Sequence, residues 1–176
     1  TLVNETYLAN KRQLELFLGR AERDAGFNWT GKTVALLGLA FKQGTNDTRN
    51  SPSIDIVNFL LEKQVGEIRC YDPAAMGWFE KIFSESEQVI YCESESECLL
   101  PPSLAPPRAG WGYASVDAVI IATDWPQFRG LGDLLLKSPN KPLVMDGRRM
   151  LAHQYKELRE AGFDVIAVGS SFVLKK

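Results

Sequence analysis

The stretch from residue 34 to residue 53 constrains this chain more than any other, because it reads as a strand, a polar loop and the start of a helix. Four apolar residues run into Gly38, as in a buried strand. Ser51 followed by Pro52 is typical of a helix N-terminus, since serine caps free N–H groups and proline has none to leave unpaired. The loop between Gly38 and Ser51 is longer than the roughly 2–6 residues that usually join a strand to a helix. We therefore predict that this loop forms a site.

Short apolar segments alternate with helical patterns along the rest of the chain, whose 176 residues are enough to bury a real core. This alternation implies right-handed βαβ crossovers. We therefore predict a Rossmann-like three-layer α/β sandwich, with an open, mostly parallel sheet and helices on both faces. The strands are expected at residues 34–37, 67–71, 88–91, 116–123, 142–145 and 163–168.

Three cations are predicted to lie along one edge of this sheet, because the carboxyl ends of parallel strands share an edge and ligands bind in the crevice there. They are Lys42, Arg49 and Arg148, each of which follows a strand end. The whole chain has 20 Lys and Arg against 22 Asp and Glu and a formal net charge of -2, which gives no general attraction to nucleic acid or to an anionic membrane. A local group of cations instead indicates a phosphate-bearing ligand.

The sequence lacks the patterns that mark a dinucleotide site, a disulfide framework, a metal site or a membrane span. Only Gly38 fits the dinucleotide fingerprint, which needs three glycines. Asp72 follows it by 34 positions rather than about 20, so we interpret Asp72 as a helix cap. Cys70, Cys92 and Cys98 have no CxxC spacing and predict neither a disulfide framework nor a metal site; they fit a reducing cytoplasm. No apolar run approaches the roughly 20 residues that span a bilayer.

Two segments differ from the alternating pattern. Residues 1–25 predict an amphipathic helix, which is either a terminal helix packed on this domain or the end of a longer helix that joins another domain. Residues 92–114 change composition to alternating Glu and Ser and then to proline pairs, which disfavour helix, so we predict an irregular surface insertion. Because the chain opens on Thr1 instead of Met, we also expect it to be a piece of a longer protein.

Five short motifs, taken in order, resemble the C-terminal UDP-binding domain of the UDP-glucose/GDP-mannose dehydrogenase family. The resemblance spans about residues 31–170, with Asn46 where the family usually has aspartate and with an insertion longer than usual. The motifs are GLAFK at 38–42, TNDTRNSP at 45–52, YDP at 71–73, ATDWPQF at 122–128 and DGR at 146–148.

The resemblance implies part of an NAD-dependent nucleotide-sugar 6-dehydrogenase, which oxidises a UDP-sugar to the uronic acid in two hydride transfers and feeds polysaccharide synthesis in the cytoplasm. Residues 1–30 would end the linking helix and its connector, and residues 31–176 would be the UDP-binding domain. The catalytic cysteine and the N-terminal domain that binds most of the NAD would lie outside this chain, so the isolated chain is expected to be inactive. Its partners would be the UDP-sugar, the N-terminal and central domains and a second copy in a homodimer, with no nucleic acid and no membrane.

The resemblance also assigns roles to single residues. Phe41 and Lys42 match positions that line the UDP site, with Lys42 near the phosphates, and Arg148 matches the arginine at the uridine end. Arg49 matches an arginine that reaches toward NAD held by the other domain. Residues 124–125 either support the site or are structural.

Two other classes of function stay open at this point. The chain could be a stand-alone, non-catalytic nucleotide-sugar-binding or assembly module, which the length of the natural gene would separate from an enzyme. A complete small Rossmann dehydrogenase is disfavoured, because the fingerprint and a nucleophile with an adjacent base are both absent from the sequence. Neither the sugar that is oxidised nor uracil over guanine follows from the sequence.

Overall fold

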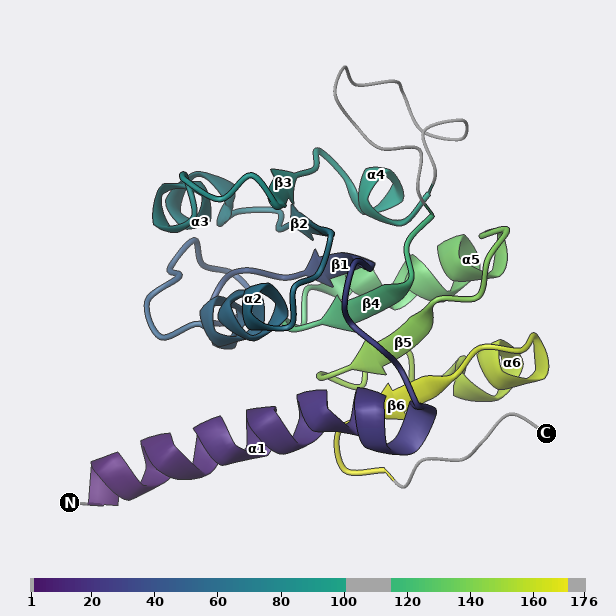
Figure 1. Ribbon diagram of the computed structural model, residues 1–176, viewed down its shortest axis with the longest axis horizontal. Helices are drawn as coiled ribbons and strands as arrows, with labels where there is room; N and C mark the ends of the chain where they lie inside the picture. The colour runs from purple at the N-terminus through teal and green to yellow at the C-terminus, as the bar shows by residue number, and fades with distance from the viewer. Residues whose placement is uncertain (1, 101–114, 171–176) are drawn as a thin grey trace.

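A computed structural model describes residues 2–100 and 115–170, which form one sheet with helices around it (Figure 1). The strands are β1 (Thr33–Leu37), β2 (Glu67–Tyr71), β3 (Val89–Tyr91), β4 (Ala118–Ile121), β5 (Leu143–Asp146) and β6 (Val165–Ala167). The helices are α1 (Leu2–Ala25), α2 (Pro52–Glu62), α3 (Met76–Ile82), α4 (Glu95–Leu99), the 3₁₀ turn η1 (Pro126–Gly130), α5 (Leu131–Leu136) and α6 (Tyr155–Glu160). Within the described ranges no helix has the length and apolar character needed to cross a membrane.

The sheet has the strand order β3-β2-β1-β4-β5-β6, and every neighbouring pair is parallel. This is the doubly wound order of nucleotide-binding folds, in which the direction of the winding reverses between the two central strands. Here the reversal falls between β1 and β4. The predicted Rossmann-like fold is therefore confirmed, and the crevice for a ligand is expected at the carboxyl ends of these two strands.

Two hydrophobic cores lie on the two faces of the sheet. Successive residues of β1 face opposite sides, so Val34 and Leu36 join one core and Ala35 and Leu37 join the other. Helices α1, α2 and α3 cover the first face, and α4, α5 and α6 cover the second. Burial of each leucine contributes about 1.5–3 kcal/mol, and all four of these β1 residues are fully buried.

The C-terminal half of α1 packs on the sheet, while its N-terminal half extends past it (Figure 1). Phe17, Leu18 and Ala21 are buried in the first core. Arg20 links these turns of α1 to the end of β6, since its Nη1 donates to the carbonyl oxygen of Ala167 at 2.9 Å. The amphipathic helix predicted for residues 1–25 thus packs on the sheet through its later turns, and its assignment as the end of an interdomain linking helix stays a prediction.

The prediction of an irregular insertion at residues 92–114 is wrong for its first part. Ser94 caps α4, because its Oγ accepts from the backbone N–H of Glu97 at 3.2 Å. Cys98 then buries its side chain in the second core. The Ser-x-x-Glu spacing is a helix-capping pattern, and the alternation of Glu and Ser concealed it in the sequence. Residues 101–114 lie outside the described residues.

Candidate functional site

The turn after β1 passes directly over the end of β4. Gly38 has a φ of 93°, and a Cβ at this position would lie 2.5 Å from the Cβ of Thr123. Only glycine fits both this backbone conformation and this close approach. Thr123 in turn donates from Oγ1 to the carbonyl oxygen of Ala40 at 2.8 Å. The contact fixes the backbone that leads into Phe41 and Lys42.

The polar loop that follows ends at a capped helix, as predicted. Ser51 accepts from the backbone N–H of Ser53 through Oγ at 3.2 Å, and Pro52 is the first residue of α2. The loop is closed on itself, because the N–H of Phe41 donates to the carbonyl oxygen of Asp47 at 2.8 Å. Its two ends are therefore held at the edge of the sheet.

Asp72, at the end of β2, is a buried junction and more than the helix cap that we predicted. Its Oδ1 closes the turn before α3, which begins at Met76 without a side-chain cap. Its Oδ2 reaches the turn after β1 and the indole of Trp125 after β4. The donors are the N–H groups of Ala74 and Ala75 at 2.8 Å each, of Leu39 at 2.7 Å and Ala40 at 3.0 Å, and Trp125 Nε1 at 2.9 Å.

A second buried carboxylate, Asp146, shapes the turn after β5. It accepts from the backbone N–H of Arg148 at 3.1 Å and from the hydroxyl of Tyr155 at 2.7 Å. The backbone N–H groups of Met150 and Leu151 complete its partners. Burial, together with the adjacent Asp146 carboxylate, raises the pKa of the Tyr155 hydroxyl, which therefore remains a donor. The turn that carries Arg148 is thus held from inside the domain.

A pocket of about 640 Å³ opens where these turns meet, a volume within the usual range for small-molecule sites. Phe41 and Lys42 line it from the turn after β1, Asp124 from the end of β4 and Arg148 from the end of β5. The three residues that we assigned to the UDP-sugar therefore share one pocket. Phe41 is 49% exposed and offers a flat apolar surface to a ligand.

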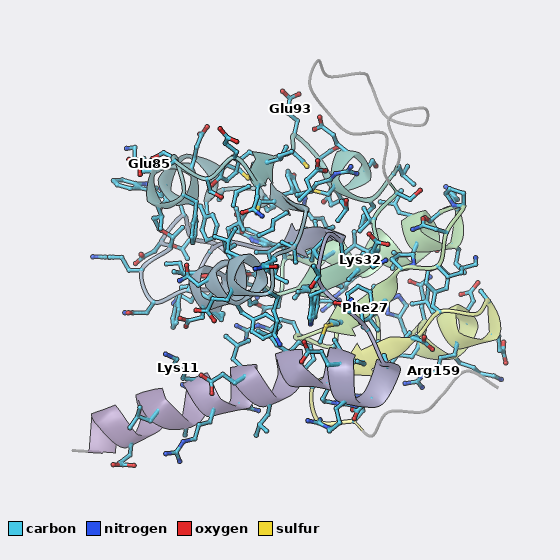
Figure 2. The ribbon with its side chains drawn as sticks, in the orientation of Figure 1. Lys11, Phe27, Lys32, Glu85, Glu93 and Arg159 are labelled. Carbon is cyan, nitrogen blue, oxygen red and sulfur yellow. The ribbon has the colours of Figure 1, made fainter. Side chains whose placement is uncertain are left out.

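Helix α1 also lines this pocket, which the sequence analysis missed. Its contributors include Asn10, Lys11, Gln13 and Phe17. In Figure 2, Lys11 lies on the side of α1 that faces α2. The apolar spacing around Phe17 indicated that the helix packs, but nothing in the spacing indicated against which edge of the sheet.

Arg49 does not line this pocket, although its loop follows the carboxyl end of β1, and its role toward NAD stays a prediction. Its side chain is 87% exposed and pairs with Asp47 through two contacts, Nε to Oδ1 at 3.0 Å and Nη2 to Oδ2 at 2.8 Å. Arg49 lines a second hollow with the loop and Trp78. A carboxylate two positions away within the same loop holds the guanidinium locally. The third cation of the first pocket is Lys11.

The first pocket therefore carries three cations, Lys11, Lys42 and Arg148, against two acids, Asp55 and Asp124. Neither lysine forms an ion pair or side-chain hydrogen bond with the residues that the structure describes. A positive balance in a chain whose formal net charge is -2 favours an anionic ligand. In residues 2–100 and 115–170 no group of three His, Cys, Asp or Glu is arranged to hold a metal ion.

Comparisons of this chain with known proteins point to one family. The model of the family described as "UDP-glucose/GDP-mannose dehydrogenase family, UDP binding domain" matches residues 35–103. UDP-glucose 6-dehydrogenase of Rickettsia felis is 33% identical over 145 residues, which cover 80% of this chain and 28% of that protein. The chain belongs to the UDP-glucose/GDP-mannose dehydrogenase family. UDP-glucose 6-dehydrogenase of Pseudomonas aeruginosa is 34% identical over 159 residues, covering 88% of this chain and 30% of that protein.

Solved structures of the family share the fold. UDP-glucose dehydrogenase from Pyrobaculum islandicum superposes with a TM-score of 0.61 at 29% identity, over 81% of this chain and 27% of that one. UDP-D-ManNAc dehydrogenase from Pyrococcus horikoshii gives a TM-score of 0.59 at 26% identity, over 89% of this chain and 30% of that one. The chain thus spans less than a third of the length of these relatives and carries the family's UDP-binding C-terminal domain.

Proposed function

We propose that the pocket at the ends of β1, β4 and β5 binds the nucleotide part of a UDP-sugar. The observation that carries the proposal is the meeting of Lys42 and Arg148 in one pocket, although they lie far apart in the sequence. Lysine offers a point charge to a phosphate and arginine a planar fork. Lys11 adds a third cation from α1.

The pocket chemistry suits a nucleotide in other respects. The half-exposed ring of Phe41 provides a surface on which a base can stack, worth about 1–3 kcal/mol per base. The carboxylates of Asp55 and Asp124 can accept hydrogen bonds from hydroxyl or N–H groups of the ligand. Each charge-assisted contact with a phosphate contributes about 1.5–3 kcal/mol.

The whole protein is proposed to be an NAD-dependent nucleotide-sugar 6-dehydrogenase, on the basis of its relatives. Its nucleophilic cysteine would lie in another part of the enzyme, because Cys70, Cys92 and Cys98 are all buried. Burial also raises the pKa of the Cys70 and Cys98 thiols, and a thiolate is the reactive form. The described part of this chain would thus supply substrate binding and no nucleophile. Its three free cysteines fit a reducing cytoplasm.

The residues after β1 do not fit an NAD site within this domain. The turn has one glycine of the three in the dinucleotide fingerprint. The N–H groups of Leu39 and Ala40, which would face a pyrophosphate, donate to Asp72 instead. We therefore place the NAD site in the other domain of the enzyme, with the exposed Arg49 reaching toward it. A homodimer of the full-length enzyme remains an expectation from the family.

Calorimetric titration of the purified chain with UDP, GDP and NAD⁺ tests the proposal. We expect UDP to bind, GDP to bind more weakly and NAD⁺ not to bind. Lys42→Ala should weaken UDP binding by about 10–100-fold, the value of one charge-assisted contact. Lys137→Ala is the matched control, since this exposed lysine follows α5 and lies outside the pocket. Equal UDP affinity of Lys42→Ala and the wild-type chain would remove Lys42 from the site.

A further inference from the structure

The buried Asp72 and the partly buried Trp125 form a bridge that spans the ends of three strands. Asp72 follows β2 and is 1% exposed, and Trp125 follows β4. The Trp125 Nε1 group donates to Asp72 Oδ2 at 2.9 Å, and the same oxygen accepts the N–H groups of the turn after β1. Neither residue lines the pocket.

The bridge acts on the residues that do line the pocket. Asp72 Oδ2 holds the N–H groups of Leu39 and Ala40, which directly precede Phe41 and Lys42. The carbonyl oxygen of Ala40 is fixed as well, by the Thr123 hydroxyl. Both sides of the Ala40 backbone are therefore anchored, and the next two side chains start from a fixed point.

Only a carboxylate satisfies this arrangement. All five partners of the Asp72 carboxylate are N–H donors, and three of them meet at Oδ2. A carboxamide has one acceptor oxygen and one donor NH₂ group, so in Asp72→Asn one set of N–H donors would face another donor. The observed geometry thus accounts for an aspartate here without any contact to a ligand.

We propose that Asp72 and Trp125 are positioning residues, which hold the turn at residues 39–42 so that Lys42 meets the phosphates of the bound nucleotide. The inference rests on the proposed UDP site. A merely structural role would predict a loss of stability with no preference for the phosphates or for Lys42. The test must therefore separate phosphate binding from folding.

Trp125→Phe is the sharpest variant, because it keeps an aromatic ring and removes the Nε1 donor, together with part of the indole volume. Trp29→Phe is its matched control, since Trp29 is buried to 1% exposure and its Nε1 has no hydrogen-bond partner within the described chain. We expect Trp125→Phe to weaken UDP binding by about three- to tenfold, less than the full loss of a bond to a charged group because two N–H donors still hold the turn. Uridine, which has no phosphate and therefore no contact with Lys42, should lose less affinity than UDP in Trp125→Phe. Trp29→Phe should leave both affinities unchanged.

A double-mutant cycle then tests whether the effect runs through Lys42. In the Lys42→Ala background, Trp125→Phe should cause a smaller further loss of UDP affinity, whereas in the Arg148→Ala background the full loss should persist. An undiminished loss with Lys42→Ala, an equal loss of uridine affinity or the same loss with Trp29→Phe would each overturn the proposal.

Amide hydrogen exchange decides the proposal independently of binding. Exchange at Leu39 and Ala40 should become about tenfold faster in Trp125→Phe and stay unchanged in Trp29→Phe, since weaker anchoring by about 1.4 kcal/mol corresponds to that factor. If the wild-type chain does not bind UDP, the proposed function is wrong. The exchange rates at Leu39 and Ala40 then still test whether the bridge between Asp72 and Trp125 holds the turn. Unchanged exchange in Trp125→Phe would overturn it.

Discussion

Arg148 donates from Nε to the carbonyl oxygen of Ala122 at 2.8 Å, which ties the end of β5 to the end of β4. No other hydrogen bond of the Arg148 side chain is found within residues 2–100 and 115–170. One nitrogen of the guanidinium therefore orients the side chain, and the two terminal nitrogens remain for a ligand in the pocket.

This division of roles predicts the effect of Arg148→Lys. Lysine keeps the charge but loses both the planar fork and the Nε bond to Ala122. We expect UDP affinity to fall by about 10–100-fold in a calorimetric titration. Arg149→Lys is the matched control, because Arg149 belongs to the same turn but donates to Val168 and lies outside the pocket. Full UDP affinity in Arg148→Lys would show that the charge alone suffices.

The contact between the ends of β1 and β4 predicts that Gly38→Ala is severely destabilising. The positive φ costs about 1–2 kcal/mol for a side chain, and overpacking against Thr123 costs about 1–3 kcal/mol more. The free energy of unfolding, measured with denaturant, should fall by about 2–5 kcal/mol. In Gly44→Ala, where φ is 75° and the added Cβ meets nothing within 4 Å, only the backbone cost should appear. Equal losses in the two variants would contradict the close approach.

The Asp47–Arg49 pair predicts a titration at low pH. The hydrogen bond from Arg49 lowers the pKa of the Asp47 carboxyl from its ordinary 3.8 to about 2. Because the folded-state pKa is depressed, the pair's contribution is present above the unfolded-state value of 3.8 and is lost as the pH falls toward about 2. In Arg49→Gln the midpoint of the carboxyl titration, followed by NMR, should return toward 3.8. A midpoint that stays near 2 would show that other groups lower it.

Thiol reactivity should separate these cysteines from a catalytic nucleophile. Cys70, Cys92 and Cys98 are buried, so alkylation should be much slower in the native chain than in the chain unfolded with guanidinium. Ser84→Cys provides a positive control, since Ser84 is exposed and its replacement should react at once. A native thiol that reacts as fast as the Ser84→Cys thiol would reopen the assignment of the nucleophile.

The local sequence pattern was sufficient for the fold and for the parts of the site that lie within one turn. Apolar runs placed the six strands of the described chain, and the Ser51-Pro52 pair placed the start of α2. Such features depend on residues a few positions apart, whose preferences act before any long-range contact forms. The strand ends then followed from parallel pairing, so Lys42 and Arg148 could be expected at one edge.

Tertiary packing alone decided which side chains meet at that edge. Lys11 enters the pocket because the apolar residues of α1 dock on the sheet beside it, and Arg49 stays out because Asp47 holds it within its own loop. The two carboxylate oxygens of Asp72 also accept from different segments, Oδ2 from the turn after β1 and Oδ1 from the turn after β2. No spacing along the chain predicts this division. These contacts join residues far apart in the sequence, and their geometry is set by how whole elements pack rather than by local preference.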